Sequence, residues 1–228
     1  MPKNPRVEFV QSRLAALADA QKSREMAAYM KTNMLFYGVQ KPARELIFRD
    51  LKRQFPITTR SEYTDTIEAL WSLPHREEKY LALAVAAGHA QFITPACLPL
   101  YRRLIIEGAW WDFVDDISTR LVGRLTLEHK GKIGPKMDRW IDDPTMWIRR
   151  SALISHINHG EQTDQRQLFD HCLRRAHEKE FFIRKAIGWA LRQYARTAPA
   201  QVSRFLRRHS QTLSPLSFRE AAKHLALE

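Results

Sequence analysis

The sequence predicts an all-α protein. Only 8 of its 228 residues are glycine, alternating β-branched residues are scarce, and apolar residues recur at helical spacing from Val7 to Leu227. A hydrophobic content of 44% is enough for a sizeable core. Because no low-complexity segment or long linker divides the chain, we expect a single domain over residues 1–228.

Prolines indicate where many of the helices begin or end. A capping residue followed by proline predicts helix starts at Thr94-Pro95, Asp143-Pro144 and Ser214-Pro215. Breaks are expected near five other prolines: Pro42, Pro56, Pro74, Pro135 and Pro199. The pattern therefore predicts many short helices joined by short turns.

Two segments about 35 residues apart share an aromatic-Ile-Arg-basic-small pattern, WIRRSAL at 147–153 and FIRKAI at 182–187. This period suits a repeat of two stacked helices, in which the second helices line one concave surface. That surface would carry four basic residues, namely Arg149, Arg150, Arg184 and Lys185. The alternative is that these cations flank the helices of an ordinary bundle.

The charge indicates the kind of partner. A formal net charge of +12 and a pI near 10.0 favour a polyanion, most often nucleic acid, although a merely soluble basic protein would fit the charge as well. Cys97 and Cys172 lack the paired spacing of a zinc site, which favours a reducing, cytoplasmic compartment. We expect no signal peptide and no membrane span, because no apolar run is long enough.

The stretch AWWDFVDD at 109–116 places two tryptophans beside acidic residues. On a helix, Trp110 begins an apolar stripe that continues through Val114, Ile117 and Leu121, so Trp110 is expected in the core. Asp112 falls in the first turn, where a carboxylate favours the helix dipole.

Trp111 shares a different face of this helix with Asp115, four residues later. The two side chains are therefore expected to face the same surroundings. The alternative for Asp115 is a surface ion pair with Arg102, Arg103 or a neighbouring helix.

Arg150 occupies an apolar stripe formed by Met146, Leu153 and Ile157. A guanidinium in that position is costly unless it meets an anion, and both Asp115 and a ligand phosphate are candidates. In the helix FFIRKAIGWALRQY, the main stripe runs through Ile183, Ile187, Leu191 and Tyr194. Trp189 lies on the adjoining face with Phe182 and Ala186, where plain packing is the favoured reading.

Other catalytic signals are missing from the sequence, which has no glycine-rich phosphate loop, HExxH motif or nucleophile elbow. Four histidines cluster with mixed spacing that gives no ordered ligand set, so we expect structural histidines and no metal site. They are His156, His159, His171 and His177.

Four motifs, YMKTNMLFYGVQKP, WWDFVDD, MWIRRSA and FFIRKAIGWALRQY, resemble the AlkD-type DNA alkylation-repair glycosylases, in the family's order and over essentially the whole chain. The resemblance implies tandem HEAT-like repeats that form a curved α-solenoid with a basic concave face around duplex DNA. It also implies hydrolysis of the N-glycosidic bond of cationic N3- or N7-alkylated purines, without base flipping, metal or cofactor. We further expect a cytoplasmic monomer, nucleoid-associated in a bacterium, with no obligate protein partner and no membrane association.

The resemblance also assigns site residues. It makes Asp115 the catalytic acid, places Trp111 and Trp189 along the lesion's deoxyribose, and puts Arg150 close to the DNA backbone. Further DNA contacts are implied at Tyr29, Gln40 and Arg192. Phe113 is bulkier than the residue expected between the motif's acids, which concerns packing and not chemistry.

Two other classes of function compete with a glycosylase. A non-catalytic HEAT-like nucleic-acid-binding module would bind DNA or RNA in a salt-dependent way and form no product. A protein-interaction scaffold would need a neutral or apolar concave face, which the repeated basic pairs oppose.

Overall fold

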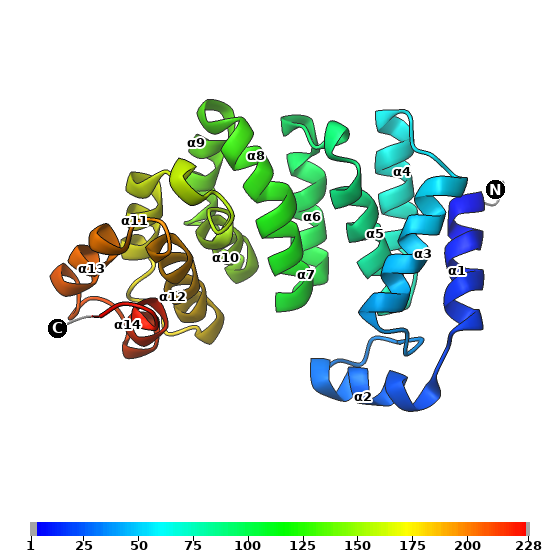
Figure 1. The fold of residues 1–228 in the computed structure, drawn as a ribbon, viewed down its shortest axis with the longest axis horizontal. Helices are drawn as coiled ribbons and strands as arrows, with labels where there is room; N and C mark the ends of the chain where they lie inside the picture. The colour runs from blue at the N-terminus through cyan, green and yellow to red at the C-terminus, as the bar shows by residue number, and fades with distance from the viewer. Residues whose placement is uncertain (1–3, 227–228) are drawn as a thin grey trace. The chain divides into compact units, whose positions relative to one another are not determined.

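A computed structural model describes residues 4–226, and it confirms the all-α prediction. Within these residues the only β-type pairing is one isolated bridge between Leu35 and His75. The chain divides between Ile93 and Thr94 into two compact units, residues 1–93 and 94–228 (Figure 1). That one domain spans residues 1–228 stays a prediction.

Residues 4–93 of unit 1 form five α-helices and a short 3-10 turn at Ala90–Phe92. The core lies where α1, α3, α4 and α5 pack together, and it contains Val10, Ile47 and Ile67. The α-helices are α1 (Pro5–Ala16), α2 (Ala20–Met30), α3 (Lys41–Gln54), α4 (Arg60–Trp71) and α5 (Arg76–Gly88).

Unit 2 begins with a 3-10 turn at Pro95–Cys97 and the helix α6 (Leu98–Gly108). A continuous helical segment follows, made of α7 (Trp111–Asp116), a π-helical stretch η3 (Ile117–Val122) and α8 (Gly123–Glu128). The remaining helices are α9 (Lys130–Trp140), α10 (Met146–Ile154), a 3-10 turn at Gly160–Gln162, α11 (Gln165–Arg174), α12 (Phe181–Ala195), α13 (Pro199–Arg208) and α14 (Pro215–Ala222).

The last six α-helices of unit 2 are arranged as pairs. Helix α9 packs on α10, α11 on α12, and α13 on α14, while the second helices α10, α12 and α14 contact one another in succession (Figure 1). This is a helical-repeat arrangement, as the echo between 147–153 and 182–187 predicts. The echoed segments are the equivalent second helices α10 and α12.

Two predictions at prolines are wrong. The helix expected at Asp143-Pro144 begins at Met146, because an Asp143 carboxylate oxygen accepts a hydrogen bond from the Thr145 N–H at 2.8 Å and holds a turn before the helix. The break expected near Pro135 is absent, since Pro135 lies inside α9. Its missing N–H would face the carbonyl of Gly131 in the exposed first turn, where water can replace the lost bond.

The other proline predictions fit the structure. Pro215 opens α14, and the Ser214 hydroxyl accepts a hydrogen bond from the Ser217 N–H at 3.1 Å. Thr94-Pro95 opens the 3-10 turn that leads into α6. Pro42 and Pro199 stand at the starts of α3 and α13, which places breaks directly before them.

Candidate active site

The two adjacent tryptophans differ because the backbone turns between α6 and α7. Ala109 ends α6 in the left-handed region with φ +34°, and Trp110 follows in an extended conformation as the residue before α7. The expectation that Trp110 begins the apolar stripe in the core is therefore wrong, and its side chain is half-buried. The stripe itself is confirmed from Val114 onward, with Ile117 and Leu121 also buried.

Trp110 instead belongs to an aromatic cluster with Trp147 of α10 and Phe182 of α12. The ring centroids lie 6.2 Å apart for Trp110 and Trp147, 5.8 Å for Trp110 and Phe182, and 4.9 Å for Trp147 and Phe182. This cluster is not among the contacts predicted from the sequence, although the aromatic residues repeated at positions 147 and 182 are a signal for it. The cluster packs the start of α7 against both α10 and α12.

Trp111 and Asp115 lie one turn apart on α7, and both are half-buried. They share a face of the helix, as the spacing predicts. Asp112 lies in the first turn, and Phe113 is fully buried, so the core accommodates its bulk.

Arg150 of α10 donates two parallel hydrogen bonds to the carboxylate of Asp115. The Arg150 Nε donates to Asp115 Oδ1 at 2.7 Å and Nη2 donates to Oδ2 at 2.8 Å, while Nη1 donates to the Phe182 carbonyl at 2.6 Å. The Arg150 guanidinium also lies 5.8 Å from the Phe182 ring centroid. Arg150 thus joins α7, α10 and the start of α12.

This pairing confirms Asp115 as one of the two anions considered for Arg150, and contact of Arg150 with the DNA backbone stays a prediction. The pairing also decides between the partners considered for Asp115, because Arg102 pairs with Asp143 at 2.7 Å and Arg103 with Glu107 at 3.9 Å. The partner of Asp115 comes from a neighbouring helix and is itself buried. The stripe around Arg150 is shorter than expected, because α10 ends at Ile154, before Ile157.

Burial raises the pKa of Asp115 above the ordinary aspartate value, and the hydrogen bonds and charge of Arg150 oppose that rise. The negative charges of Asp112 and Asp116 add to it. The Asp115 side chain keeps 18% of its surface exposed, against 6% for Arg150. The carboxylate is therefore fixed in direction and still open to an incoming molecule.

Trp189 lies in the second half of α12 and is half-buried. It stands two turns after Phe182 on the same helix face, about 10 Å along the axis. Ile183, Ile187 and Leu191 of the main stripe are buried, as expected. A role for Trp189 beside a lesion stays a prediction.

The basic residues predicted to contact DNA are mostly paired within unit 2. Arg149 donates two bonds of 2.9 Å to the Glu178 carboxylate and further bonds to the carbonyls of Asp143 and Pro144. Lys185 and Arg192 both contact Glu220 of α14, at 2.9 and 2.6 Å.

The remaining predicted DNA contacts are less enclosed. Arg184 is half-buried, and its Nε has no hydrogen-bond partner among residues 4–226. In unit 1, Tyr29 on α2 has 75% of its surface exposed, and Gln40 is exposed directly before α3. DNA contact by Tyr29, Gln40, Arg149, Arg184, Lys185 and Arg192 stays a prediction.

A buried glutamate fixes the loop that leads to Gln40. Glu77 is fully buried, and its carboxylate accepts hydrogen bonds from the backbone N–H groups of Tyr37 at 3.1 Å, Gly38 at 2.8 Å and Val39 at 3.0 Å. Sequence reasoning missed this residue, because it stands in a run of four charged residues, 76–79, that has the composition of an exposed helix start. The neighbouring capping-box residue Glu78 was the one available signal.

Three of the four clustered histidines come together in the fold. The ring of His156 lies 5.5 Å from that of His159 and 6.0 Å from that of His171. His159 contacts the Gly123 carbonyl at 2.8 Å and His171 contacts Asp138 at 2.9 Å, whereas His177 is exposed. Burial lowers the pKa of His156 well below the ordinary histidine value, which favours a neutral, structural ring.

Comparison with known proteins identifies the family. The sequence matches the family described as DNA alkylation repair enzyme over residues 10–225, whereas no curated protein matches. A solved structure titled a predicted DNA alkylation repair enzyme from Enterococcus faecalis is similar to this chain, with 29% identity and a TM-score of 0.85, covering 92% of this chain and 98% of the other. None of the helices in residues 4–226 has the length and apolar composition of a membrane span. With its helical-repeat fold and this match over most of its length, the chain belongs to the DNA alkylation repair enzyme family.

Proposed function

We propose that the protein is a DNA glycosylase that hydrolyses the N-glycosidic bond of cationic N3- or N7-alkylated purines in duplex DNA. The observation that carries this proposal is the Asp115 carboxylate, which Arg150 orients through two hydrogen bonds and which stays partly exposed beside Trp111. The match to a DNA alkylation repair family supports DNA as the partner. The proposed enzyme acts as a monomer and needs no metal or cofactor.

The chemistry suits a single carboxylate. An alkylated N3 or N7 purine already carries a positive charge, so it leaves without protonation by a strong general acid. As the bond lengthens, positive charge moves onto the deoxyribose, and Asp115 stabilises this oxocarbenium-like state electrostatically. The same carboxylate can orient or deprotonate the attacking water.

Arg150 is best suited to positioning Asp115. Its guanidinium donates to both Asp115 oxygens and to the Phe182 carbonyl, and only 6% of its side chain is exposed. Arg150 opposes the rise in the pKa of Asp115 that burial causes, and it aims the carboxylate in one direction. A backbone phosphate at the lesion could meet Arg150 only through that small exposed edge.

The indole rings supply attraction for positive charge. Trp111 shares its helix face with Asp115, and each indole near a cationic base or an electron-poor sugar contributes about 0.5 to 2 kcal/mol. Trp189 is proposed to act from α12 in the same way. Recognition through sugar and backbone leaves the damaged base stacked, so bulky adducts would also be accepted.

The test measures release of 7-methylguanine and 3-methyladenine from methylated duplex DNA by the wild-type protein and by Asp115→Asn. We expect the variant to be at least about a hundredfold slower, because the amide cannot stabilise the developing cation. Asp116→Asn is the matched control: it makes the same change one residue away, at a side chain 34% exposed and paired with Arg120.

The outcomes separate the candidate functions. Equal release by wild type and Asp115→Asn would remove the role of Asp115. Tight, salt-dependent binding by wild type with no abasic product would favour the non-catalytic binding module, in which the Asp115–Arg150 pair is purely structural. Circular dichroism melts of both variants would exclude loss of fold as the cause.

A further inference from the structure

The helix α13 presents a basic surface that the Asp115 site does not use. Its apolar side chains Val202, Phe205 and Leu206 are buried, and the Phe205 ring stacks on Phe169 of α11 at 4.2 Å. This packing turns the opposite face of α13 to solvent. That face carries three exposed arginines, Arg204, Arg207 and Arg208.

Half of the other 20 Arg and Lys side chains in unit 2 are paired with an acidic residue, and these three arginines are not. Within residues 4–226, none of the three makes a hydrogen bond or an ion pair, whereas ten other Arg and Lys side chains of unit 2 are paired with a carboxylate. The paired residues are Arg102, Arg103, Arg120, Arg124, Arg149, Arg150, Arg174, Arg175, Lys185 and Arg192.

Placing the three cations together has a cost for the helix. Arg204 lies three and four residues before the other two, and like charges at these spacings repel on a helix. The helix dipole favours Arg207 and Arg208 in the last turn. It does not favour Arg204, which lies further from the C-terminal end, so an external anion is the better explanation for the set.

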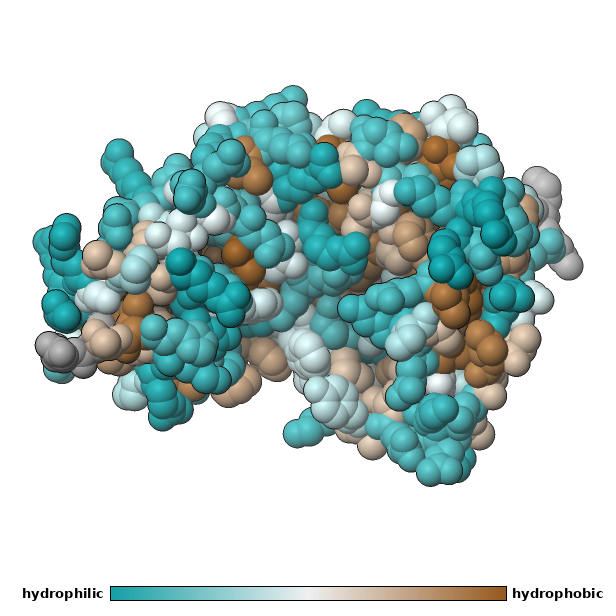
Figure 2. Space-filling model, in the orientation of Figure 1, coloured by the Kyte–Doolittle hydropathy of each residue, from teal (hydrophilic) through white to brown (hydrophobic). Residues whose placement is uncertain are grey.

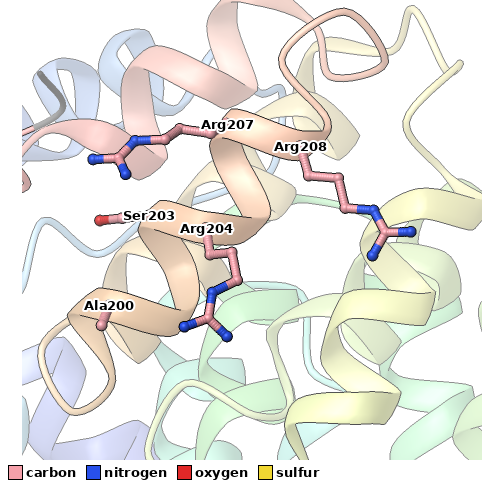
Figure 3. Close-up of a pocket in the computed structure, with 5 residues that line it drawn as sticks. All are labelled: Ala200, Ser203, Arg204, Arg207 and Arg208. Carbon is pink, nitrogen blue, oxygen red and sulfur yellow. The ribbon is translucent and has the colours of Figure 1, made fainter.

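The arginines surround an open hollow of about 700 Å³, whose other lining residues are Ala200 and Ser203. Figure 3 shows the three guanidinium groups pointing in different directions from α13, with Arg207 and Ser203 toward the left of the view, Arg208 toward the right and Arg204 downward. A second hollow, of about 230 Å³, shares Arg204 and Arg208. It is otherwise lined by the polar Gln165, Gln201 and His209 and by the apolar Phe169, Leu173 and Phe205. No acidic residue lines either hollow, and Figure 2 shows hydrophilic side chains at the edge where α13 lies.

We propose that this α13 surface, defined by Ser203, Arg204, Arg207 and Arg208, binds the phosphodiester backbone of duplex DNA outside the Asp115 site. Arginine, serine and glutamine side chains are the donors that proteins use on DNA phosphates. The larger hollow has no aromatic side chain on which a single-stranded base could stack, and no large apolar side chain to insert into a membrane. None of its lining residues belongs to the Asp115 site.

The test measures binding to undamaged duplex DNA by fluorescence anisotropy at several salt concentrations. We compare wild type with Arg204→Gln/Arg207→Gln/Arg208→Gln. The matched control, Arg103→Gln/Arg120→Gln/Arg124→Gln, removes the same charge from side chains that are each paired with an acid one turn away. A second variant, Arg204→Lys/Arg207→Lys/Arg208→Lys, keeps the three positive charges.

We expect the α13 glutamine variant to bind on the order of tenfold more weakly, with a slope of log Kd against log salt reduced by about 2 to 3, since each lost phosphate contact removes about 0.9. The control and the lysine variant keep the wild-type slope. Because the probe is undamaged DNA, the result does not depend on the proposed glycosylase activity.

Several results would overturn the proposal. An unchanged slope in the α13 glutamine variant would show that the three arginines do not contact phosphates, and an equal loss in the control would show an effect of net charge alone. Unchanged DNA binding together with lost binding to anionic lipid vesicles or to single-stranded RNA would assign the surface to that partner instead. If the triple variant fails a circular dichroism melt, the three single variants are used, each with an expected slope loss of about 0.9.

Discussion

Glu77 in unit 1 and Asp115 in unit 2 are both carboxylates withdrawn from water, but their partners differ. Glu77 is fully buried and accepts hydrogen bonds from three backbone N–H groups of one loop. Asp115 keeps 18% of its side chain exposed, and its main partner is the side chain of Arg150 on another helix.

The difference separates a structural acid from a candidate catalytic one. The oxygens of Glu77 are satisfied by backbone groups that have no other partner available, so this carboxylate holds the fold of the loop. One guanidinium holds both oxygens of Asp115 along one edge of the carboxylate, and the side chain stays 18% exposed, which leaves an open direction for a ligand. Both acids are withdrawn from water, so it is the type of partner and the remaining exposure that make Asp115, and not Glu77, the candidate catalytic acid.

The largest expected effect on stability comes from Glu77→Ala. This change leaves three backbone donors near Tyr37, Gly38 and Val39 without an acceptor, so we expect the free energy of unfolding to fall by about 3 kcal/mol or more. Urea denaturation measures the loss. Glu45→Ala is the control, because Glu45 is 66% exposed in a surface pair with Lys41 and should change stability by less than about 0.5 kcal/mol. Similar losses in the two variants would break the comparison.

A smaller effect is expected for the coupling between Asp115 and Arg150. In a double-mutant cycle of Asp115→Ala and Arg150→Ala, we expect a coupling energy of about 2 kcal/mol, because each single variant leaves the other group partly buried without its partner. Thermal and urea unfolding of the four proteins supply the cycle. Additive losses would mean that the bidentate pair contributes nothing to stability.

The smallest expected effect is a shift in the pH dependence of base excision, caused by the raised pKa of Asp115. Burial raises its pKa, so excision that depends on the ionised carboxylate should fall, as the pH is lowered, at a higher pH than for an ordinary aspartate. The contribution of Asp115 to folding stability changes with pH in the opposite direction. The folded protein holds the proton more tightly than the unfolded chain, so the contribution of Asp115 to stability decreases as the pH rises from the ordinary value to the raised one.

Single-turnover excision rates measured at a series of acidic pH values show the pH at which activity falls, the acid limb of the pH profile. Asp115→Asn provides the control, because its residual activity should lack the limb. An acid limb that persists unchanged in Asp115→Asn would assign the titration to another group.

Much of the site could be predicted from the sequence because its packing follows helical periodicity. The stripe of Val114, Ile117 and Leu121 is buried as expected, and the arginine within an apolar stripe meets an acid. Which side chains share a face of a helix depends only on their spacing within that helix, so the sequence alone predicts it. Charge predicts that the buried guanidinium of Arg150 meets an anion, but only the structure identifies Asp115 as a partner.

Other features depend on backbone conformations and long-range contacts that no local sequence pattern predicts. Trp110 leaves the helix because Ala109 takes a positive φ, a conformation usually marked by glycine. The burial of Glu77 depends on a loop about 40 residues earlier in the chain, so no local pattern distinguishes it from a solvated acid. Pro135 sits in a helix that sequence rules would end.

The π-helical stretch Ile117–Val122 begins two residues after Asp115 and runs into α8, where Gly123 lies so close to the Ser155 carbonyl that a Cβ would come within 2.7 Å of it. A π-helical turn contains more residues than an α-helical turn, so this stretch holds about one residue more than a regular α-helix would need to join α7 and α8 with the same facing. Losing one residue inside the stretch would restore a regular α-helix, with Asp115 still facing Arg150 and Gly123 still against the Ser155 carbonyl. The same loss within α7 or α8 would turn one of these contacts away by roughly 100°. The π-helical stretch is therefore a place where this segment tolerates a change in length that the α-helical turns on either side do not.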